Sequence, residues 1–166
     1  MGVYEITNEL EAAINSNLAT HMAAIDVAKD VKLVKRFKLY KRERAETFYQ
    51  RTLPGVGVWI FDVSTGAVSQ ARRKWDATAG IDYFFQGTDR QDVAKQVELT
   101  LDAMMRVIDG LTPAAGTNTI QGASENQFAT QIVHDIDDLV QEASVGVGEI
   151  ISGFRIMLPV TTEDQV

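Results

Sequence analysis

Residues 56–63, VGVWIFDV, form an almost unbroken apolar run, in which six of the eight side chains are apolar. A strand with one face in water alternates apolar and polar residues, whereas a strand covered on both faces is apolar nearly throughout. We therefore predict a strand near the centre of a sheet, with other elements packed on both of its faces. The Leu-Pro-Gly at 53–55 marks its entry, and the Ser-Thr-Gly at 64–66 is typical of a turn.

Two further strands are predicted downstream. Residues 75–85 alternate, and their apolar set comprises Trp75, Ala77, Ala79, Ile81, Tyr83 and Phe85. This period of two predicts a strand with one wetter face, which ends at Gly87. Residues 150–160, IISGFRIMLPV, predict the last strand of the fold, and residues 161–166 a flexible C-terminal tail.

Two amphipathic helices are predicted from apolar residues at steps of three and four. In residues 5–24 the buried stripe comprises Ile6, Leu10, Ala13, Ile14, Leu18 and Met22, and it continues to Ile25. The second helix begins near residues 88–91, where Thr-Asp-Arg-Gln matches a capping box, and it ends at Gly110. Its buried stripe comprises Val93, Val97, Leu101, Met104 and Ile108.

Residues 31–44, VKLVKRFKLYKRER, hold seven Lys and Arg side chains in fourteen positions. As a strand, this segment places Val31, Leu33, Phe37 and Leu39 on one face and Lys32, Arg36, Lys38, Arg42 and Arg44 on the other. Helical spacing through Leu33, Phe37, Tyr40 and Phe48 fits almost as well. We favour the strand, because β-branched and aromatic residues are frequent here and a buried strand follows soon after.

The remaining segments complete a single domain over residues 1–160. Residues 112–124, TPAAGTNTIQGAS, lack periodicity and predict a long loop, and residues 144–148 predict a turn region. Residues 131–142 fit either a strand or a helix. The order of elements predicts an α+β fold, with a mixed or antiparallel sheet of about four to five strands packed by two main helices.

Composition and charge narrow the class of protein. The chain of 166 residues has no Cys, so disulfides and thiolate metal sites are excluded. No run is long and apolar enough for a membrane helix, and the N-terminus lacks a secretion signal, so we expect a soluble, unsecreted protein. The net charge of −7 is uneven, because residues 25–51 carry +5 and residues 111–166 carry −7. Such segregation suits self-association of unlike patches as well as binding to DNA.

The sequence offers few groups for catalysis or metal binding. One cluster combines His134, Asp135, Asp137, Asp138 and Glu142. It lacks the ligand spacing of a calcium loop, so we interpret it as a solvated acidic face. Neither a phosphate-binding glycine motif nor a nucleophile motif is present. We therefore expect no catalytic, metal-binding or cofactor-binding residues, and a protein that is not an enzyme.

Nucleic-acid binding has some support in the basic segment, where Phe37 and Tyr40 interleave with Lys and Arg. In a strand, however, Phe37 shares the buried face. The net negative charge also repels a polyanion. We therefore expect DNA at most as a molecule that passes close to the protein.

In this order the elements resemble the tail terminator, or tail-completion, proteins of long-tailed bacteriophages. The resemblance spans most of the chain: the amphipathic helix from Ile6 to Met22, an irregular extended stretch, and the strand GVGVWIFDV behind Leu-Pro at 53–54. It continues with the strand over residues 75–85, the helix that starts at residues 89–92 and the terminal strands within residues 132–160. The Leu-Pro entry and the spacing of Trp75, Ala77, Ile81 and Phe85 are its closest parts. Residues 29–48 and the 112–124 loop depart from the pattern.

The resemblance implies a structural virion protein of the tail or neck, assembled in the cytoplasm of the host cell. Such a protein forms a hexameric ring on the last ring of the tail tube, stops tube polymerisation and joins the tail to the neck or head-completion protein. No catalytic residue or cofactor comes with it, and DNA at most passes through the lumen. A head–tail connector or neck protein is the nearest alternative. A small nucleic-acid-binding regulatory module is the alternative of a different class.

On this interpretation, five basic side chains contact acidic groups of an adjacent subunit or of a tail or neck partner. They are Lys32, Arg36, Lys38, Arg42 and Arg44. A single exposed ion pair contributes only about 0–1 kcal/mol, so several would have to act together. Contact of the same side chains with DNA is the competing interpretation.

Overall fold

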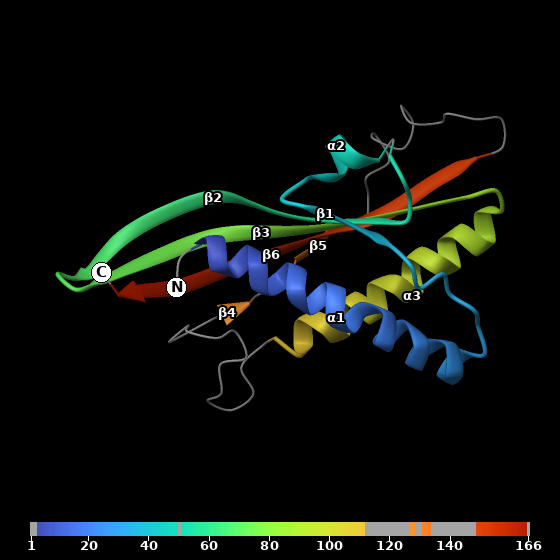
Figure 1. Ribbon diagram of the computed structural model, residues 1–166, viewed down its shortest axis with the longest axis horizontal. Coiled ribbons are helices and arrows are strands. Elements are labelled where there is room, and N and C mark those ends of the chain that lie inside the picture. Colours follow the sequence, from blue (N-terminus) through green and yellow to red (C-terminus); the bar gives the residue numbers. More distant parts are fainter. Residues whose placement is uncertain (1–2, 50, 112–126, 129–130, 134–148, 166) are drawn as a thin grey trace.

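The structure is a computed structural model that describes residues 3–49, 51–111, 127–128, 131–133 and 149–165 (Figure 1). Along the chain its elements are α1 (Val3–Lys29), β1 (Lys38–Lys41), α2 (Ala45–Phe48), β2 (Gly55–Ser69), β3 (Arg72–Gly87), α3 (Arg90–Asp109), β4 (Gln127–Phe128), β5 (Gln131–Val133) and β6 (Ile150–Gln165). These elements confirm the predicted α+β class.

The strands form one mixed sheet in the order β1-β2-β3-β6-β4, with β5 also paired to β6. β1 runs parallel to β2, and the other pairs are antiparallel. β4 and β5 are short pieces on the outer side of β6.

Several predicted segments fall wholly or partly outside the described residues. The long loop predicted at 112–124, the turn region at 144–148 and the acidic cluster within 134–142 all lie there. Of the segment 131–142, which fits a strand or a helix by sequence, residues 131–133 form β5.

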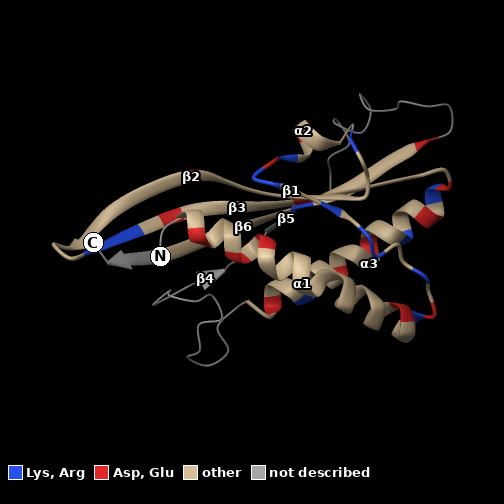
Figure 2. Ribbon diagram, in the orientation of Figure 1, with Lys and Arg blue, Asp and Glu red and all other residues tan. Residues whose placement is uncertain are grey.

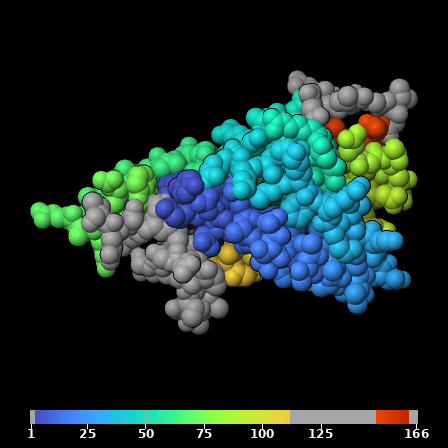
Figure 3. Space-filling view, viewed as in Figure 1, coloured from blue at the N-terminus to red at the C-terminus, as the bar shows by residue number. Residues whose placement is uncertain are grey.

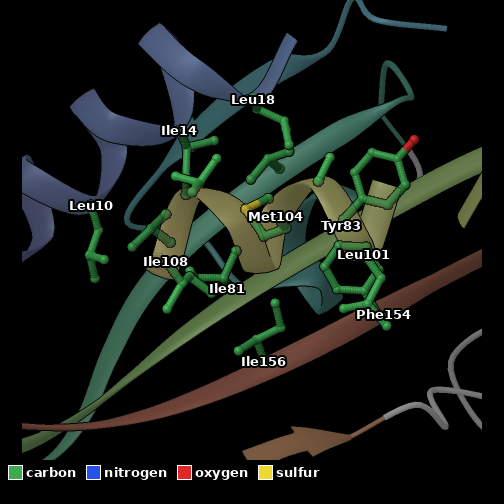
Figure 4. Packing of buried hydrophobic residues seen from close by; sticks show 14 of the residues in the cluster. Leu10, Ile14, Leu18, Ile81, Tyr83, Leu101, Met104, Ile108, Phe154 and Ile156 are labelled. Carbon is green, nitrogen blue, oxygen red and sulfur yellow. The ribbon is translucent and has the colours of Figure 1, made fainter. Parts of the chain in front are cut away.

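α1 and α3 pack together on one face of the sheet and bury the main hydrophobic core (Figure 1). In Figure 4, Ile14 and Leu18 of α1 and Met104 of α3 lie over Ile81 of β3. The predicted helical stripes are confirmed except at Ala13, which is only partly buried. The buried members are Ile6, Leu10, Ile14, Leu18, Met22 and Ile25 in α1, and Val93, Val97, Leu101, Met104 and Ile108 in α3.

The first turn of α3 differs by one residue from the predicted capping box. The N-cap is Asp89, whose side chain accepts a hydrogen bond from the backbone N–H of Asp92 at 3.0 Å. An Asp side chain caps at least as well as a Thr, and its negative charge also suits the positive end of the helix dipole. Asp89 therefore takes the role that the sequence pattern gave to Thr88.

β2 and β3 form a hairpin that is much longer than predicted. They stay paired as far as Ser69 and Arg72, so residues 70–71 connect them, and the turn predicted at 64–66 is wrong. The register shifts between Phe61 and Ser64, where Asp62 has a φ of 52°. This bulge bends the strand without ending it. The small and polar residues that follow the bulge therefore still belong to β2.

β6 follows the hairpin to its tip. Residues 161–165 pair with β3 in continuous register, from Asp76 opposite Thr161 to Arg72 opposite Gln165. The prediction of a flexible tail from residue 161 is therefore wrong for these residues. The neighbouring strand β3 pairs with these residues, and the sequence of the tail alone does not reveal this partner.

The basic segment is a strand only in part. β1 covers Lys38–Lys41, and residues 31–37 are extended without a sheet partner, so the strand predicted over 31–44 is wrong outside β1. Side chains, and not a neighbouring strand, form hydrogen bonds with the backbone of this segment. The carboxylate of Asp26 accepts a hydrogen bond from the Leu33 N–H at 2.8 Å. Gln96 accepts from the Val34 N–H at 2.9 Å and donates to the Val34 carbonyl at 3.0 Å. Extended backbone has a period of two, so burial still alternates along residues 31–39 as predicted.

Candidate functional site

The second face of the sheet is covered by residues 42–49, which include α2. Together with the edge strand β1 and residues 51–54 they form a segment, residues 38–49 and 51–54, that we call the strap. Glycines of the sheet leave room for it. A Cβ at Gly57 would lie 2.2 Å from the Glu43 carbonyl oxygen, and a Cβ at Gly80 would lie 2.2 Å from Cε2 of Trp59. Real Cβ atoms essentially never come this close. The strap can therefore lie against Gly57, and the indole of Trp59 against Gly80, only because these residues have no Cβ.

An aromatic cluster fixes the strap to the sheet. Tyr40 stacks on Phe48 with ring centroids 4.7 Å apart, and Phe48 meets the edge of Phe84 of β3 at 6.2 Å. The Tyr40 hydroxyl donates to the Thr52 carbonyl at 2.8 Å. Tyr40 is only 4% exposed, so its ring is not available to stack on a nucleic-acid base.

Asp82 of β3 lies under the strap and is fully buried. Its carboxylate accepts from the backbone N–H of Ala45 at 2.7 Å, which ties down the start of α2. It also accepts from the Trp59 indole N–H at 3.0 Å. Arg155 of β6 donates to both of its oxygens, from Nε at 2.8 Å and from Nη2 at 3.0 Å. Four donors on two oxygens satisfy the buried charge.

Arg155 joins this carboxylate to the strap. Its Nη2 also donates to Glu46 of α2 at 2.7 Å, and its guanidinium lies 4.9 Å from the centroid of the Trp59 ring. Arg44 of the strap lies 4.3 Å from the same centroid. Burial alone lowers the pKa of Arg155, but hydrogen bonds and charge from Asp82 and Glu46 outweigh it and raise the pKa well above its ordinary value.

This network ties the strap to the sheet. Each of its charged groups already contacts a partner within the chain. Among the described residues, no group of three or more His, Asp, Glu or Cys side chains could hold a metal ion. None of the helices in the described part of the chain is long and apolar enough to cross a membrane.

The five predicted contact residues divide into two groups, of which the first is bound within the chain. Arg42 has a φ of 56° and docks on α1. Its N–H donates to Glu11 at 3.1 Å, its Nη2 donates to Asn8 at 2.8 Å, and its guanidinium lies 4.6 Å from the Tyr4 ring centroid. Arg44 covers Trp59, as described above. Both side chains therefore contact the protein's own surface.

The second group, Lys32, Arg36 and Lys38, lies on the exposed side of the extended segment. Lys38 lies 5.4 Å from the Tyr40 ring centroid. Lys32 and Arg36 make no hydrogen bond or ion pair with the described residues. These three side chains remain available to a partner.

Sequence reasoning missed the network around Asp82, which the alternating pattern assigned to a wetter face. A usable signal was present. Asp82 and Arg155 are opposite charges inside two strands that are otherwise largely apolar, and a charge in such a strand needs a partner. Their distance in the chain hides the pairing, because only the β3–β6 register places them opposite each other.

The hairpin tip projects beyond the helices (Figures 1 and 3). We call this part the ribbon, comprising residues 62–74 of β2 and β3 and residues 163–165 of β6. All side chains from 62 to 74 are exposed, including Val63 (49%) and Val68 (52%). These side chains bury no core of their own, so the ribbon is a surface suited to contact with another molecule.

Comparison of the chain with models of protein families and with curated proteins finds no match in either case.

Proposed function

We propose that this protein is a structural assembly subunit, and that it acts as the tail terminator of a long-tailed bacteriophage. In this role a ring of subunits sits on the last ring of the tail tube, stops tube polymerisation and presents a surface to the neck or head-completion protein. The projecting ribbon is the observation that carries the proposal. Strands that extend past the core gain little for the isolated chain, whereas they gain burial when neighbouring subunits cover them.

The distribution of charge supports an assembly role in a second way. Lys32, Arg36 and Lys38 form an exposed basic row along the extended segment, on a chain whose net charge is −7. Unlike patches on one subunit favour head-to-tail contacts, which close into a ring when the rotation between copies permits it.

A nucleic-acid-binding module has less support. Its case depended on aromatic rings interleaved with bases, but Tyr40 is buried under the strap, and Arg42 and Arg44 contact the chain's own Tyr4 and Trp59. A neck protein of related shape stays the nearest alternative, because the same ribbon would serve it.

Two measurements test the proposal. Native mass spectrometry of the purified chain should give a closed multimer, six subunits on the tail terminator interpretation. Added to tail-tube protein of the same phage during polymerisation, the chain should cap the tubes and shorten them in electron micrographs. Multimers that leave tube length unchanged would favour the neck protein, and a monomer at high concentration would contradict both assembly roles.

A further inference from the structure

The exposed basic row lies along the extended segment 31–37 and the first residue of β1. This segment runs from the end of α1 to β1 and passes the first half of α3 (Figure 1). None of the described strands pairs with it. Hydrogen bonds hold it near both ends instead, where Asp26 accepts from the Leu33 N–H at 2.8 Å and the Lys38 N–H donates to the Pro54 carbonyl at 2.9 Å.

Between these ends, the side-chain amide of Gln96 binds the backbone of Val34 twice. Its Oε1 accepts from the Val34 N–H at 2.9 Å, and its Nε2 donates to the Val34 carbonyl at 3.0 Å. Two residues of an antiparallel ladder exchange the same two kinds of hydrogen bond. A single side chain of α3 therefore takes the place of a neighbouring strand at the centre of the extended segment.

Gln96 is itself fixed in the core, because its side chain is only 5% exposed. Its Nε2 also lies 3.3 Å from the hydroxyl of Tyr83 and 3.3 Å from the hydroxyl of Thr100, and both of these residues are buried. An amide nitrogen carries two N–H donors, so one can bind Val34 while the other points to the hydroxyls. The extended segment is thus tied to the packed interior and not to another surface group.

Val34 lies in the middle of the basic row. Along an extended backbone, alternate residues point to the same side and are roughly 6.6 Å apart. Lys32, Arg36 and Lys38 therefore share one exposed side with Val34. The two hydrogen bonds to Gln96 keep the residues before and after Val34 in line. Charges that are already in line lose less conformational freedom when a partner binds than charges on a loose loop do.

We propose that Gln96 is the positioning residue of the basic row, and that the row fits an extended acidic segment whose carboxylates lie on alternate residues. Gln96 acts through the backbone of Val34 and not through the basic side chains. An extended partner repeats at the same roughly 6.6 Å, so its carboxylates meet the row in register. This inference rests on the proposed function, in which the row contacts acidic groups of a neighbouring subunit or of a tail or neck partner.

Two peptides of equal composition test the fit. In one, Glu and Thr alternate, and in the other a block of Glu precedes a block of Thr. An extended chain of the first kind presents all its carboxylates on one side, whereas the second presents only half of them there. At low salt the native chain should bind the alternating peptide about two- to fivefold more tightly, the factor that one more exposed ion pair supplies. Fluorescence anisotropy of the labelled peptides measures both affinities.

The variant Gln96→Met keeps the length of the side chain but has no amide, so it should bind both peptides equally. Arg36→Glu/Lys38→Glu should lose most of its binding to both. The matched control is Leu101→Ala, which removes a buried side chain of the same helix and leaves the bonds to Val34 in place. It should be less stable in urea and still prefer the alternating peptide. Should Gln96→Met fail to fold, Gln96→Asn tests the same bonds, because its amide is one methylene too short to reach Val34.

The outcomes separate this inference from the proposed function. A preference that survives in the folded Gln96 variant would overturn the positioning role, and so would its loss in Leu101→Ala, which would trace the preference to general stability. Equal binding of the two peptides by the native chain would overturn the extended acidic partner, and a multimer in native mass spectrometry would then leave the proposed function standing. A monomer that prefers the alternating peptide would contradict the proposed function and leave the role of Gln96 in place.

Discussion

Asp82 is the residue on which the second face of the sheet depends, because four hydrogen bonds from the strap, β2 and β6 converge on its two oxygens. A buried charge is tolerated only when paired, so the removal of one partner costs more than the pair itself contributes. A change at this one side chain therefore affects groups from three segments, the strap, β2 and β6.

We predict that Asp82→Asn lowers the free energy of unfolding by about 3–5 kcal/mol, because Arg155 loses its charged partner in a buried site. Urea unfolding followed by circular dichroism measures the loss. The matched control is Asp76→Asn on the same strand, where the side chain is half exposed and accepts from Thr161 at 2.7 Å. Equal losses in the two variants would contradict a special role for Asp82.

Glu46 gives the fold a dependence on pH. Burial raises the pKa of Glu46, but the hydrogen bond from Arg155, a backbone hydrogen bond and the charges of Arg155 and Arg44 outweigh it, so that the pKa is lower than its ordinary value of 4.5. A carboxyl whose pKa is lower in the folded state stabilises the fold above the unfolded pKa. That contribution disappears as pH falls below 4.5 and through the folded pKa.

We therefore predict that Glu46→Gln is less stable than the native chain at pH 7, by less than about 1 kcal/mol because the side chain is partly exposed. The difference should shrink towards zero as the pH falls below 4.5. Urea midpoints of both proteins across this range measure it. A difference that stays constant with pH would show that the ionised form of Glu46 is not the stabilising one.

At the scale of elements, the strap and the sheet fit together through glycine. A substituted residue at Gly80 forces the indole of Trp59 away from the sheet, since its Cβ would lie 2.2 Å from the ring. At Gly66 in the ribbon nothing lies within 4 Å of such a Cβ. Substitution of glycine by alanine should therefore disturb the packing at Gly80 of β3 and leave it undisturbed at Gly66 of β2.

We predict that Gly80→Ala lowers the free energy of unfolding by about 1–3 kcal/mol, the usual cost of overpacking, and shifts the emission of Trp59 to the red as the ring gains exposure. A Trp75→Phe background leaves Trp59 as the sole tryptophan, because the chain has two. In the same background Gly66→Ala should change neither stability nor emission appreciably. Unchanged emission in Gly80→Ala would mean that the indole keeps its place.

At the scale of the whole molecule, the exposed basic row and the ribbon are separate surfaces, one beside β1 and the other at the hairpin tip (Figure 2). In the proposed ring the ribbon joins copies, and the basic row meets acidic groups of a neighbour or a tail or neck partner. Ion pairs between such surfaces are weakened by salt.

We predict that Arg36→Glu/Lys38→Glu weakens this second contact, and that its loss matches the effect of raised salt on the native chain. Analytical ultracentrifugation in the presence and absence of the tail or neck partner measures it. The control Arg90→Glu/Arg106→Glu makes the same change in net charge at exposed positions of α3 and should behave as the native chain does. Equal weakening by both variants would point to net charge and not to this row.

Much of the fold could be predicted from the sequence wherever a pattern within one segment decides the structure. The stripe from Ile6 to Ile25 fixes α1, and the apolar run at 56–63 indicates a strand covered on both faces, which is correct for Gly55–Trp59. The same strand loses its cover from residue 62, and no local pattern showed this. The turn predicted at 64–66 failed for a related reason, since pairing with β3 overrides the preference of a few small residues.

Of the candidate site, the sequence by itself determined which residues are basic and that they alternate with apolar ones, and both follow from local spacing. Only the tertiary structure decided that Arg42 and Arg44 contact the chain's own surface while Lys32, Arg36 and Lys38 stay exposed. It also decided that Asp82 is buried beneath Arg155 and that the ribbon projects beyond the helices. The physical reason is that periodicity reports the face on which a side chain lies, whereas its partner is supplied by a strand or helix far away in the chain.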